Sequence, residues 1–279
     1  MIKSLSIATI FWRLLFLLPI LCNQAFAQSS AGIAAIKNSN NAIGIQAIST
    51  YVNYTETVEG RISNTEQGYV PGFALNASFM QDWLLGNDYL AATYSQSNGN
   101  TNYTGSYIGS SQGYGSVKTT SPATLTDFSL RYGKGFVLND QFMATPFIEL
   151  GSHQWDRNLR TYQETYTNNY YGIGLLGQLA MTNAFVLSAS ALVGNTANSN
   201  ISISGSPYTG GALGNSTIYR LGISGDYAFT KSLHGNIGLD YTSFSYGQST
   251  PTRVGRFVYY EPSSTSQYTT YKIGLSYNF

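Results

Sequence analysis

The chain has few charged residues, one cysteine and, beyond its N-terminus, no long apolar run. Charged residues make up 10% of its 279 residues, whereas soluble domains carry about 25%. Fourteen Lys and Arg against thirteen Asp and Glu leave no basic excess, so nucleic acid is not an expected partner. No later segment approaches the ~20 apolar residues of a membrane helix, so a helical membrane protein is excluded.

Disulfide, metal and cofactor chemistry lack the residues that they need. The one cysteine, Cys22, lies in a segment that we expect to be removed, so the mature chain has no thiolate and no disulfide. The two histidines, His153 and His234, are far apart, and no acidic cluster has ligand spacing. The glycine-rich segment Gly205–Gly214 has no helical pattern after it, which argues against a phosphate-binding loop. The sequence therefore predicts neither a metal nor a cofactor.

The N-terminus has the pattern of a secretory signal peptide. Lys3 and Arg13 supply positive charge, Leu14–Leu21 forms a short apolar core, and Ala25–Ala27 is an A-x-A cleavage site. Cleavage there would make Gln28 the first residue of the mature chain. Two basic residues leave with the signal, so twelve basic and thirteen acidic residues give the mature chain a formal charge of −1.

The chain does contain alternation, which is clearest in its last segment. Over Tyr268–Phe279 the odd positions from 271 onward are apolar or aromatic, and the even positions are small or polar. Side chains of a strand alternate between its two faces, so one face is apolar and the other polar. Such a strand, ending on an aromatic residue behind a secretory signal, resembles the closing strand of bacterial outer-membrane β-barrels. That resemblance implies insertion by the barrel-assembly machinery, with Tyr277 and Phe279 in the signal that it reads.

Nine further segments alternate in a similar way, and short and long connections join them in turn. Four connections are short and carry Gly, Asn, Asp, Thr or Lys, of which the first three supply the backbone freedom of tight reversals. Five are long and polar, over about 56–71, 98–122, 156–168, 197–215 and 247–266. The predicted strands are Asn41–Thr55, Gly72–Leu84, Asp88–Ser97, Ala123–Leu138, Gln141–Trp155, Asn169–Met181, Ala184–Thr196, Ser216–Phe229, Ser232–Tyr246 and Gln267–Phe279.

This pattern predicts an all-β fold, a transmembrane up-and-down antiparallel β-barrel of about ten strands. A secreted β-sandwich would show the same alternation, but aromatic strand ends, a polar inner face and connections of alternating length favour a barrel in lipid. An even strand number places both termini in the periplasm, with short periplasmic turns and long extracellular loops. We expect a signal peptide over residues 1–27, an N-terminal periplasmic tail over 28–40 and an outer-membrane barrel domain over 41–279.

Ionisable side chains within the strands fall mostly on the polar face. A hairpin centred on Asp140 would place Arg131 opposite Glu149 and Asp127 opposite His153. Opposed side chains of an antiparallel pair are close enough to interact, which predicts two ion pairs in the lumen.

A second hairpin, centred on residue 230, would place Arg220 opposite Asp240 and Asp226 opposite His234. Lys272 lies on the same polar face of the last strand and is predicted to join Asp240. Pairing is expected because an isolated charge is costly away from bulk water. We interpret all these residues as structural ion pairs that fill the barrel. The alternative is a charged constriction that selects a small permeant.

An enzymatic role has little support among these residues. Some outer-membrane barrels are proteases, phospholipases or lipid A-modifying enzymes, and each needs a positioned base. His153, oriented by Asp127 beside Ser129, would be such a constellation, but serine is abundant in this chain. The omptin-type pattern of D-x-D and D-x-H does not occur. We expect no enzymatic activity.

The long connections combine tyrosine with small polar residues, the composition of adaptable binding loops. Hydrophilic outer loops without a ligand would have the same composition. Arginines near the outer rim could also bind lipopolysaccharide phosphates, whose geometry guanidinium groups match. The candidate contact residues are Tyr103, Tyr107, Tyr114, Arg157, Arg160, Arg253 and Arg256.

The whole pattern resembles small outer-membrane barrels of the opacity or surface-protein type, without a motif that transfers any functional residue. The resemblance implies a non-enzymatic surface protein, either envelope-structural or ligand-binding through its loops. Its expected partners are outer-membrane lipid, lipopolysaccharide, the barrel-assembly machinery and an extracellular ligand. The alternatives are a narrow pore for small solutes with a charged lumen and, third, an outer-membrane hydrolase.

Overall fold

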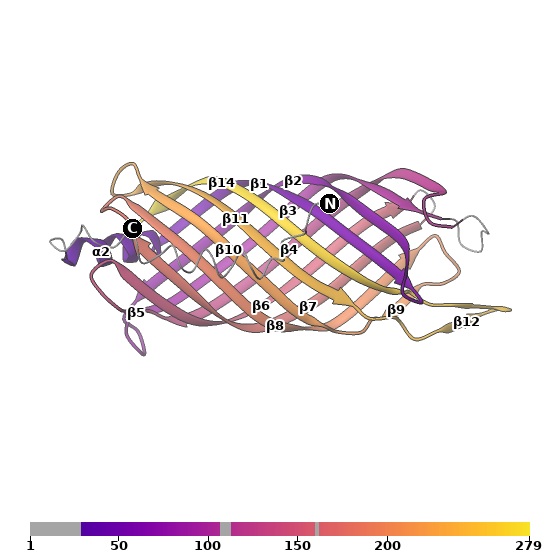
Figure 1. Cartoon of the computed structure of the whole chain (residues 1–279). Coiled ribbons are helices and arrows are strands. Elements are labelled where there is room, and N and C mark those ends of the chain that lie inside the picture. The colour runs from indigo at the N-terminus through magenta and orange to yellow at the C-terminus, as the bar shows by residue number, and fades with distance from the viewer. Residues whose placement is uncertain (1–28, 107–112, 160–161) are drawn as a thin grey trace, which may run out of the picture.

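Ten long antiparallel strands form a closed barrel in the computed structural model, which describes residues 29–106, 113–159 and 162–279 (Figure 1). Each long strand pairs with the next one along the chain, and β14 also pairs with β1, so the sheet closes on itself. The predicted fold class and strand number are confirmed. The long strands are β1 Ala42–Val58, β2 Arg61–Gln81, β3 Asp88–Gly105, β4 Val117–Lys134, β6 Phe142–Leu159, β7 Tyr162–Ala180, β8 Phe185–Ser204, β10 Thr217–Ala228, β11 Leu233–Tyr246 and β14 Ser263–Asn278.

The short elements mark the two ends of the barrel. The helix α2, the C-terminus and the short turns lie at one end, which we call the helix end (Figure 1). The ribbon of β12 and β13 projects beyond the opposite end, which we call the ribbon end. The short elements are α2 Ser29–Ser39, β5 Phe136–Val137, β9 Gly210–Ala212, β12 Thr252–Val254 and β13 Phe257–Tyr259.

The expected signal peptide, residues 1–27, lies outside the described residues. Among the residues that are described, no helix is long and apolar enough to cross a membrane.

A belt of exposed apolar side chains surrounds the barrel beside the helix end. Ile45 and Ile273 are typical, with 56% and 62% of their surface exposed. Such a continuous apolar surface, bordered by aromatic residues, is the lipid-facing surface of a membrane barrel. The aliphatic members include Ile43, Ile45, Leu75, Ile148, Leu150, Ile173, Leu175, Ile223, Ile237, Ile273 and Leu275. The bordering aromatic residues include Tyr69, Tyr171, Tyr219 and Tyr271 on the ribbon side, and Tyr227, Phe229, Tyr277 and Phe279 on the helix side.

Four of the five predicted long loops are wrong, because the strands continue well beyond the belt. The expected loop over 56–71 is a hairpin whose turn is Glu59–Gly60, with φ of 51° and 76°. The regions 98–122, 156–168 and 197–215 also contain mostly strand. The inner face of these extensions packs both aromatic side chains, such as Tyr166, and polar ones, such as Glu66. The apolar alternation is therefore weaker in the sequence while the backbone stays extended. In 247–266, by contrast, the strands β12 and β13 form the separate ribbon, which is not part of the barrel sheet.

Candidate functional site

β4 and β6 pair in the predicted register, which brings four ionisable residues of the lumen together as two pairs. Arg131 donates from Nε and Nη2 to Oε2 of Glu149, at 2.8 and 2.7 Å. Nδ1 of His153 lies 2.7 Å from Oδ1 of Asp127. Glu149 and His153 are buried, so both partners of each pair are needed to offset the loss of water.

The second predicted register is wrong by two residues. Arg220 lies opposite Thr242, and Asp240 lies opposite Gly222. The predicted opposition of Arg220 and Asp240 is therefore absent. A shift of two residues keeps every side chain on its face of the sheet, so both charges still point into the lumen.

The cause of the shift is the turn between β10 and β11. Oγ1 of Thr230 accepts hydrogen bonds from the backbone N–H groups of Ser232 and Leu233, at 3.3 and 3.0 Å. The N–H of Phe229 in turn donates to the carbonyl of Leu233 at 3.0 Å. A threonine that caps its own turn in this way moves the centre of the hairpin one residue along the chain.

Arg220 contacts Glu149 and Tyr170 across the lumen in place of Asp240, using Nη1 for both. The hydroxyl of Tyr170 also donates to Oε1 of Glu149 at 3.0 Å. The buried carboxylate of Glu149 is thus shared by Arg220, Arg131 and Tyr170. One acidic group therefore connects β4, β6, β7 and β10.

Two further ion pairs point into the lumen from β10, β11 and β14. Nζ of Lys272 lies 2.6 Å from Oδ2 of Asp240, the contact that the sequence predicted. Asp226 and His234 also touch, with 2.6 Å between Oδ1 and Nδ1, although they are diagonal and not directly opposed. Diagonal neighbours on one face of a sheet are within reach of long or aromatic side chains.

A cavity of about 330 Å³ lies in the lumen among these pairs. Hydroxyl and amide side chains complete its wall, including those of Gln46, Thr93 and Ser190. A polar cavity of this size has room for several water molecules. The acidic, basic and histidine residues of its wall are Asp127, Arg131, Glu149, His153, Arg220, Asp226, Asp240 and Lys272.

His153 is held by neighbours on both ring nitrogens. Nδ1 faces Asp127, and Nε2 lies 3.2 Å from the hydroxyl of Tyr268. The ring also packs edge-on against Phe244, with 5.5 Å between the centroids. Tyr268, and not Ser129, therefore occupies the position beside Nε2. The serine constellation considered from the sequence is not assembled.

At the helix end of the lumen, α2 packs against the barrel wall, in the segment that the sequence predicted as an N-terminal periplasmic tail. Ile36 of α2 is fully buried. The side chains of Asn40 and Gln178 exchange two hydrogen bonds, at 2.7 and 2.9 Å. Asn41 bonds to both the N–H and the carbonyl of Met80, at 2.9 and 3.2 Å. These bonds fix the end of α2 to β7 and β2.

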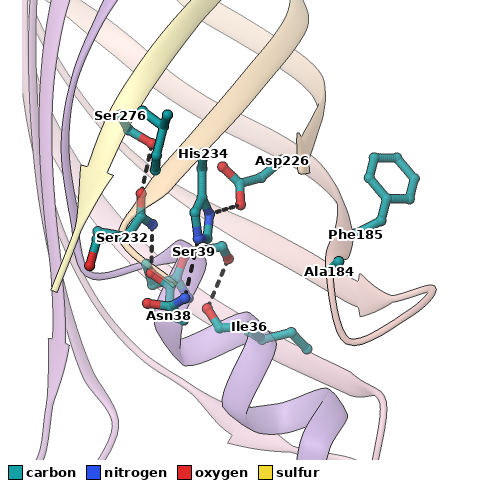
Figure 2. A network of polar contacts seen from close by, with 12 residues as sticks. Ile36, Asn38, Ser39, Ala184, Phe185, Asp226, Ser232, His234 and Ser276 are labelled. Atoms are coloured by element: carbon teal, nitrogen blue, oxygen red, sulfur yellow. Dashed lines mark hydrogen bonds and ion pairs between the residues drawn. The ribbon is translucent and has the colours of Figure 1, made fainter. Parts of the chain in front are cut away.

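Figure 2 shows how the opposite wall meets the helix. Nδ2 of Asn38 lies 3.2 Å from Nε2 of His234, whose other nitrogen faces Asp226. Asn278 donates to the backbone carbonyl of Asn38 at 2.8 Å, and Ser276 donates to Oδ1 of Asn278 at 2.8 Å. The predicted pair of Asp226 and His234 is therefore one link between the barrel wall and α2.

A buried polar network closes the ribbon end. Its centre is Arg157, which the sequence predicted as an extracellular contact and which is only 2% exposed inside the barrel. Arg157 donates from Nε to Glu164 at 2.6 Å, from Nη1 to Glu66 at 3.0 Å and from Nη2 to the hydroxyl of Tyr166 at 3.1 Å. These bonds run from β6 to β7 and across the lumen to β2.

Four buried aromatic rings lie next to this network. Ring centroids are 5.1 Å apart for Tyr54 and Trp155, 5.7 Å for Trp155 and Tyr166, and 5.4 Å for Tyr166 and Tyr246. All four side chains are at most 1% exposed. Rings packed at these distances leave no room for bulk water, so the lumen is filled at this end.

The sequence analysis missed Glu56, Glu66, Glu164 and Glu261 as interior residues, all of them buried. For the three that lie on strands, the sequence did contain a signal, namely parity: whether a residue number is odd or even decides which face of the strand its side chain is on. On β1, for example, Glu56 has the same parity as the lumen-facing Gln46. A strand that continues beyond the membrane keeps its alternation of faces.

Among the described residues, the others that the sequence predicted as extracellular contacts do not form one cluster with Arg157. Tyr103 lies within β3, and Tyr114 is an exposed turn residue whose hydroxyl lies 2.9 Å from Oγ1 of Thr65. Arg253 and Arg256 belong to the exposed ribbon. The other two, Tyr107 and Arg160, lie outside the described residues.

Tyr277 and Phe279 point outward at the helix-side border of the belt, with 62% and 51% of their surfaces exposed. The ring of Phe279 lies 5.5 Å from that of Phe79. Their role as an assembly signal stays a prediction.

Comparisons with known proteins show similarity in structure but not in sequence. No family model and no curated protein matches the chain. The outer-membrane protease OmpT of Escherichia coli superposes with a TM-score of 0.52 at 11% identity, over 85% of this chain and 95% of that one. Neisserial surface protein A (NspA) matches at 10% identity with a TM-score of 0.31, over 85% and 97%. The chain thus has the fold of the small bacterial outer-membrane β-barrels, without a narrower subfamily.

Proposed function

We propose that the protein is a non-enzymatic, non-conducting surface protein of the outer membrane, with its ribbon end outside the cell and its helix end in the periplasm. The even number of strands and the short turns beside both α2 and the C-terminus support this orientation. The strand extensions then stand above the membrane.

The observation that carries this proposal is the closure of the lumen at both ends. A pore for small solutes needs a continuous water path, but α2 and the two residues after it pack against β7, β2 and β11 at the helix end (Figure 2). At the ribbon end, Arg157 links Glu66 and Glu164 from different sides of the lumen. The cavity of about 330 Å³ lies between these closures. The charged residues around it are mutual partners, which supports a structural role over a selective constriction.

The ribbon is the element best suited to contact an extracellular ligand. Phe257 and Val258 are 54% and 58% exposed, beside the exposed guanidinium groups of Arg253 and Arg256. The only acidic residue between 247 and 266 is Glu261, which is buried. An exposed cationic and aromatic surface suits anionic groups on a ligand, and we propose lipopolysaccharide phosphate as one such group. Insertion by the barrel-assembly machinery through the last strand is part of the same proposal.

Conductance in planar bilayers tests the proposal. The refolded wild-type barrel should give no steady single-channel openings over a range of voltages. A variant without residues 29–38 and with both Arg157→Ala and Trp155→Ala is the control. It should conduct because the helix, the buried network and the ring packing are all weakened. Steady openings of the wild type would instead establish the pore.

A further inference from the structure

The buried network at the ribbon end contains more negative than positive charge. It holds the carboxyl groups of Glu56, Glu66, Glu164 and Glu261 and one guanidinium group, that of Arg157. Arg157 pairs with Glu66 and Glu164. Among the ion pairs of the described residues, none includes Glu56 or Glu261. Because an unpaired buried charge is costly, one of these two groups is expected to hold a proton.

Glu261 is connected to the ribbon as well as to the network. It follows directly after the ribbon, and its backbone forms two hydrogen bonds with Ser249, which precedes the ribbon. The N–H of Glu261 donates to Oγ of Ser249 at 2.7 Å, and the N–H of Ser249 donates to the carbonyl of Glu261 at 2.9 Å. On the network side, the hydroxyl of Tyr166 donates to Oε1 of Glu261. The position of Glu261 therefore fixes both chain segments that join the ribbon to the barrel, the one before it and the one after it.

A second contact fastens the ribbon to the barrel. The hydroxyl of Tyr208 lies 3.0 Å from Oγ of Ser249. Its ring stacks on that of Tyr259 in β13, with centroids 6.0 Å apart and planes inclined by 10°. The ribbon is otherwise exposed, and a two-stranded ribbon alone is only marginally stable in water. Its order thus depends on this anchor.

We propose that Glu261 is a proton-dependent latch, which holds the ribbon against the barrel while its carboxyl group is neutral and releases it on ionisation. The groups that face Glu261 are Glu56 and Tyr54 of β1, Glu164 and Tyr166 of β7, and Arg157 of β6. Ionisation would place a further negative charge beside Glu56 and Glu164, both already buried. A role of the latch in ligand contact rests on the function proposed above. The latch itself does not depend on that function.

Burial, together with the carboxylates of Glu56 and Glu164, raises the pKa of Glu261 to about 8, whereas a solvated glutamate titrates near ~4.3. The latched state therefore binds one more proton than the released state between these values. Latching is strongest below the pKa of the released form and weakens as pH rises toward that of the latched form. For one proton the ratio of latched to released molecules falls up to about tenfold per pH unit, then becomes constant.

Limited proteolysis of the ribbon measures this ratio. Trypsin cuts after Arg253 and Arg256, and mass spectrometry identifies those cuts in the folded, vesicle-embedded protein. When release is fast relative to cleavage, the rate follows the released fraction. Rates are divided by those of an unstructured peptide covering residues 249–262, which removes the pH dependence of trypsin itself.

The wild-type rate should rise by up to about tenfold per pH unit from pH 6 to pH 8 and then level off. Glu261→Gln, which mimics the neutral carboxyl group, should be cut slowly at every pH. Glu59→Gln, at an exposed turn, is the matched control and should keep the wild-type profile. Glu56→Gln removes a neighbouring negative charge and should move the plateau to lower pH.

A wild-type rate that is constant with pH, or a Glu261→Gln protein that keeps the wild-type slope, would overturn the latch. Neither result depends on whether the barrel conducts.

Discussion

The partner of Arg220 offers the sharpest test of the lumen structure. Hairpin pairing alone predicts Asp240, but the structure gives Arg220 to Glu149, on the far side of the lumen. Two double-mutant cycles separate these possibilities. One combines Arg220→Met with Glu149→Gln, and the other combines Arg220→Met with Asp240→Asn.

The expected coupling follows from burial and from the number of partners. The side chain of Glu149 is 1% exposed, and that of Arg220 is 28% exposed, facing the cavity. Contacting residues of one network couple by about 0.5–3 kcal/mol. Water in the cavity screens Arg220 in part, and Arg131 still serves Glu149 when Arg220 is lost, so we expect about 1–2 kcal/mol for this pair. For Arg220 and Asp240, which share no hydrogen bond among the described contacts, we expect less than about 0.5 kcal/mol.

Reversible urea unfolding of the barrel in lipid vesicles at pH 7 measures both couplings. Equal slopes of the unfolding free energy against urea for all variants would show that the unfolded state is unchanged. A coupling of Arg220 with Asp240 as large as that with Glu149 would refute the assigned register and the contact across the lumen.

Two further predictions concern the helix end. Asn40→Ala leaves Oε1 of the buried Gln178 amide without its donor, although Nε2 keeps Ser188, and should lower the free energy of unfolding by about 1–3 kcal/mol, measured in the same urea assay; an unchanged midpoint would mean that α2 is not fastened there. The hydrogen bond from Tyr132 and those from backbone N–H groups, including that of Leu84, hold the pKa of Asp88 well below its ordinary value. Because that pKa is depressed, the stabilisation exists above the unfolded pKa, near ~3.9, and is lost as pH falls below it. The difference in stability between wild type and Asp88→Asn should therefore shrink between pH 5 and pH 3, whereas a constant difference would contradict this account.

Alternation was enough to predict the barrel, because it is a property of each strand alone. Ile273 faces lipid and Lys272 faces the lumen for the same reason, namely that successive side chains point to opposite faces. The register of β4 and β6 also followed from sequence, since charges on both strands agreed on one centre. Parity and local pairing therefore account for the fold and for four of the five ion pairs described in the middle of the lumen.

The errors arose where a contact depends on something other than parity. Charge matching favoured a hairpin centre at Thr230, but the hydroxyl of that residue caps the turn and moves the centre. The contact of Arg220 with Glu149 crosses the lumen, so it depends on the curvature of the closed sheet. Hairpin pairing contains no information about that distance.

The helix was missed for a different reason. An isolated helix of eleven residues is marginal in water, and its sequence has only a few apolar residues. Its stability comes from burial of Ile36 and from the amide pair of Asn40 with Gln178. These partners are more than 100 residues away, so local propensity could not reveal the helix.

The balance of acidic and basic groups differs between the middle of the lumen and its ribbon end. In the middle, every carboxylate has a cation or a histidine within contact distance, as Glu149 has Arg131 and Arg220. At the ribbon end, one arginine faces four carboxyl groups, so protonation must supply the balance. The excess of carboxyl groups thus lies in the part of the barrel that carries the ribbon, and the membrane-spanning wall can keep its paired charges while the ribbon is held or released.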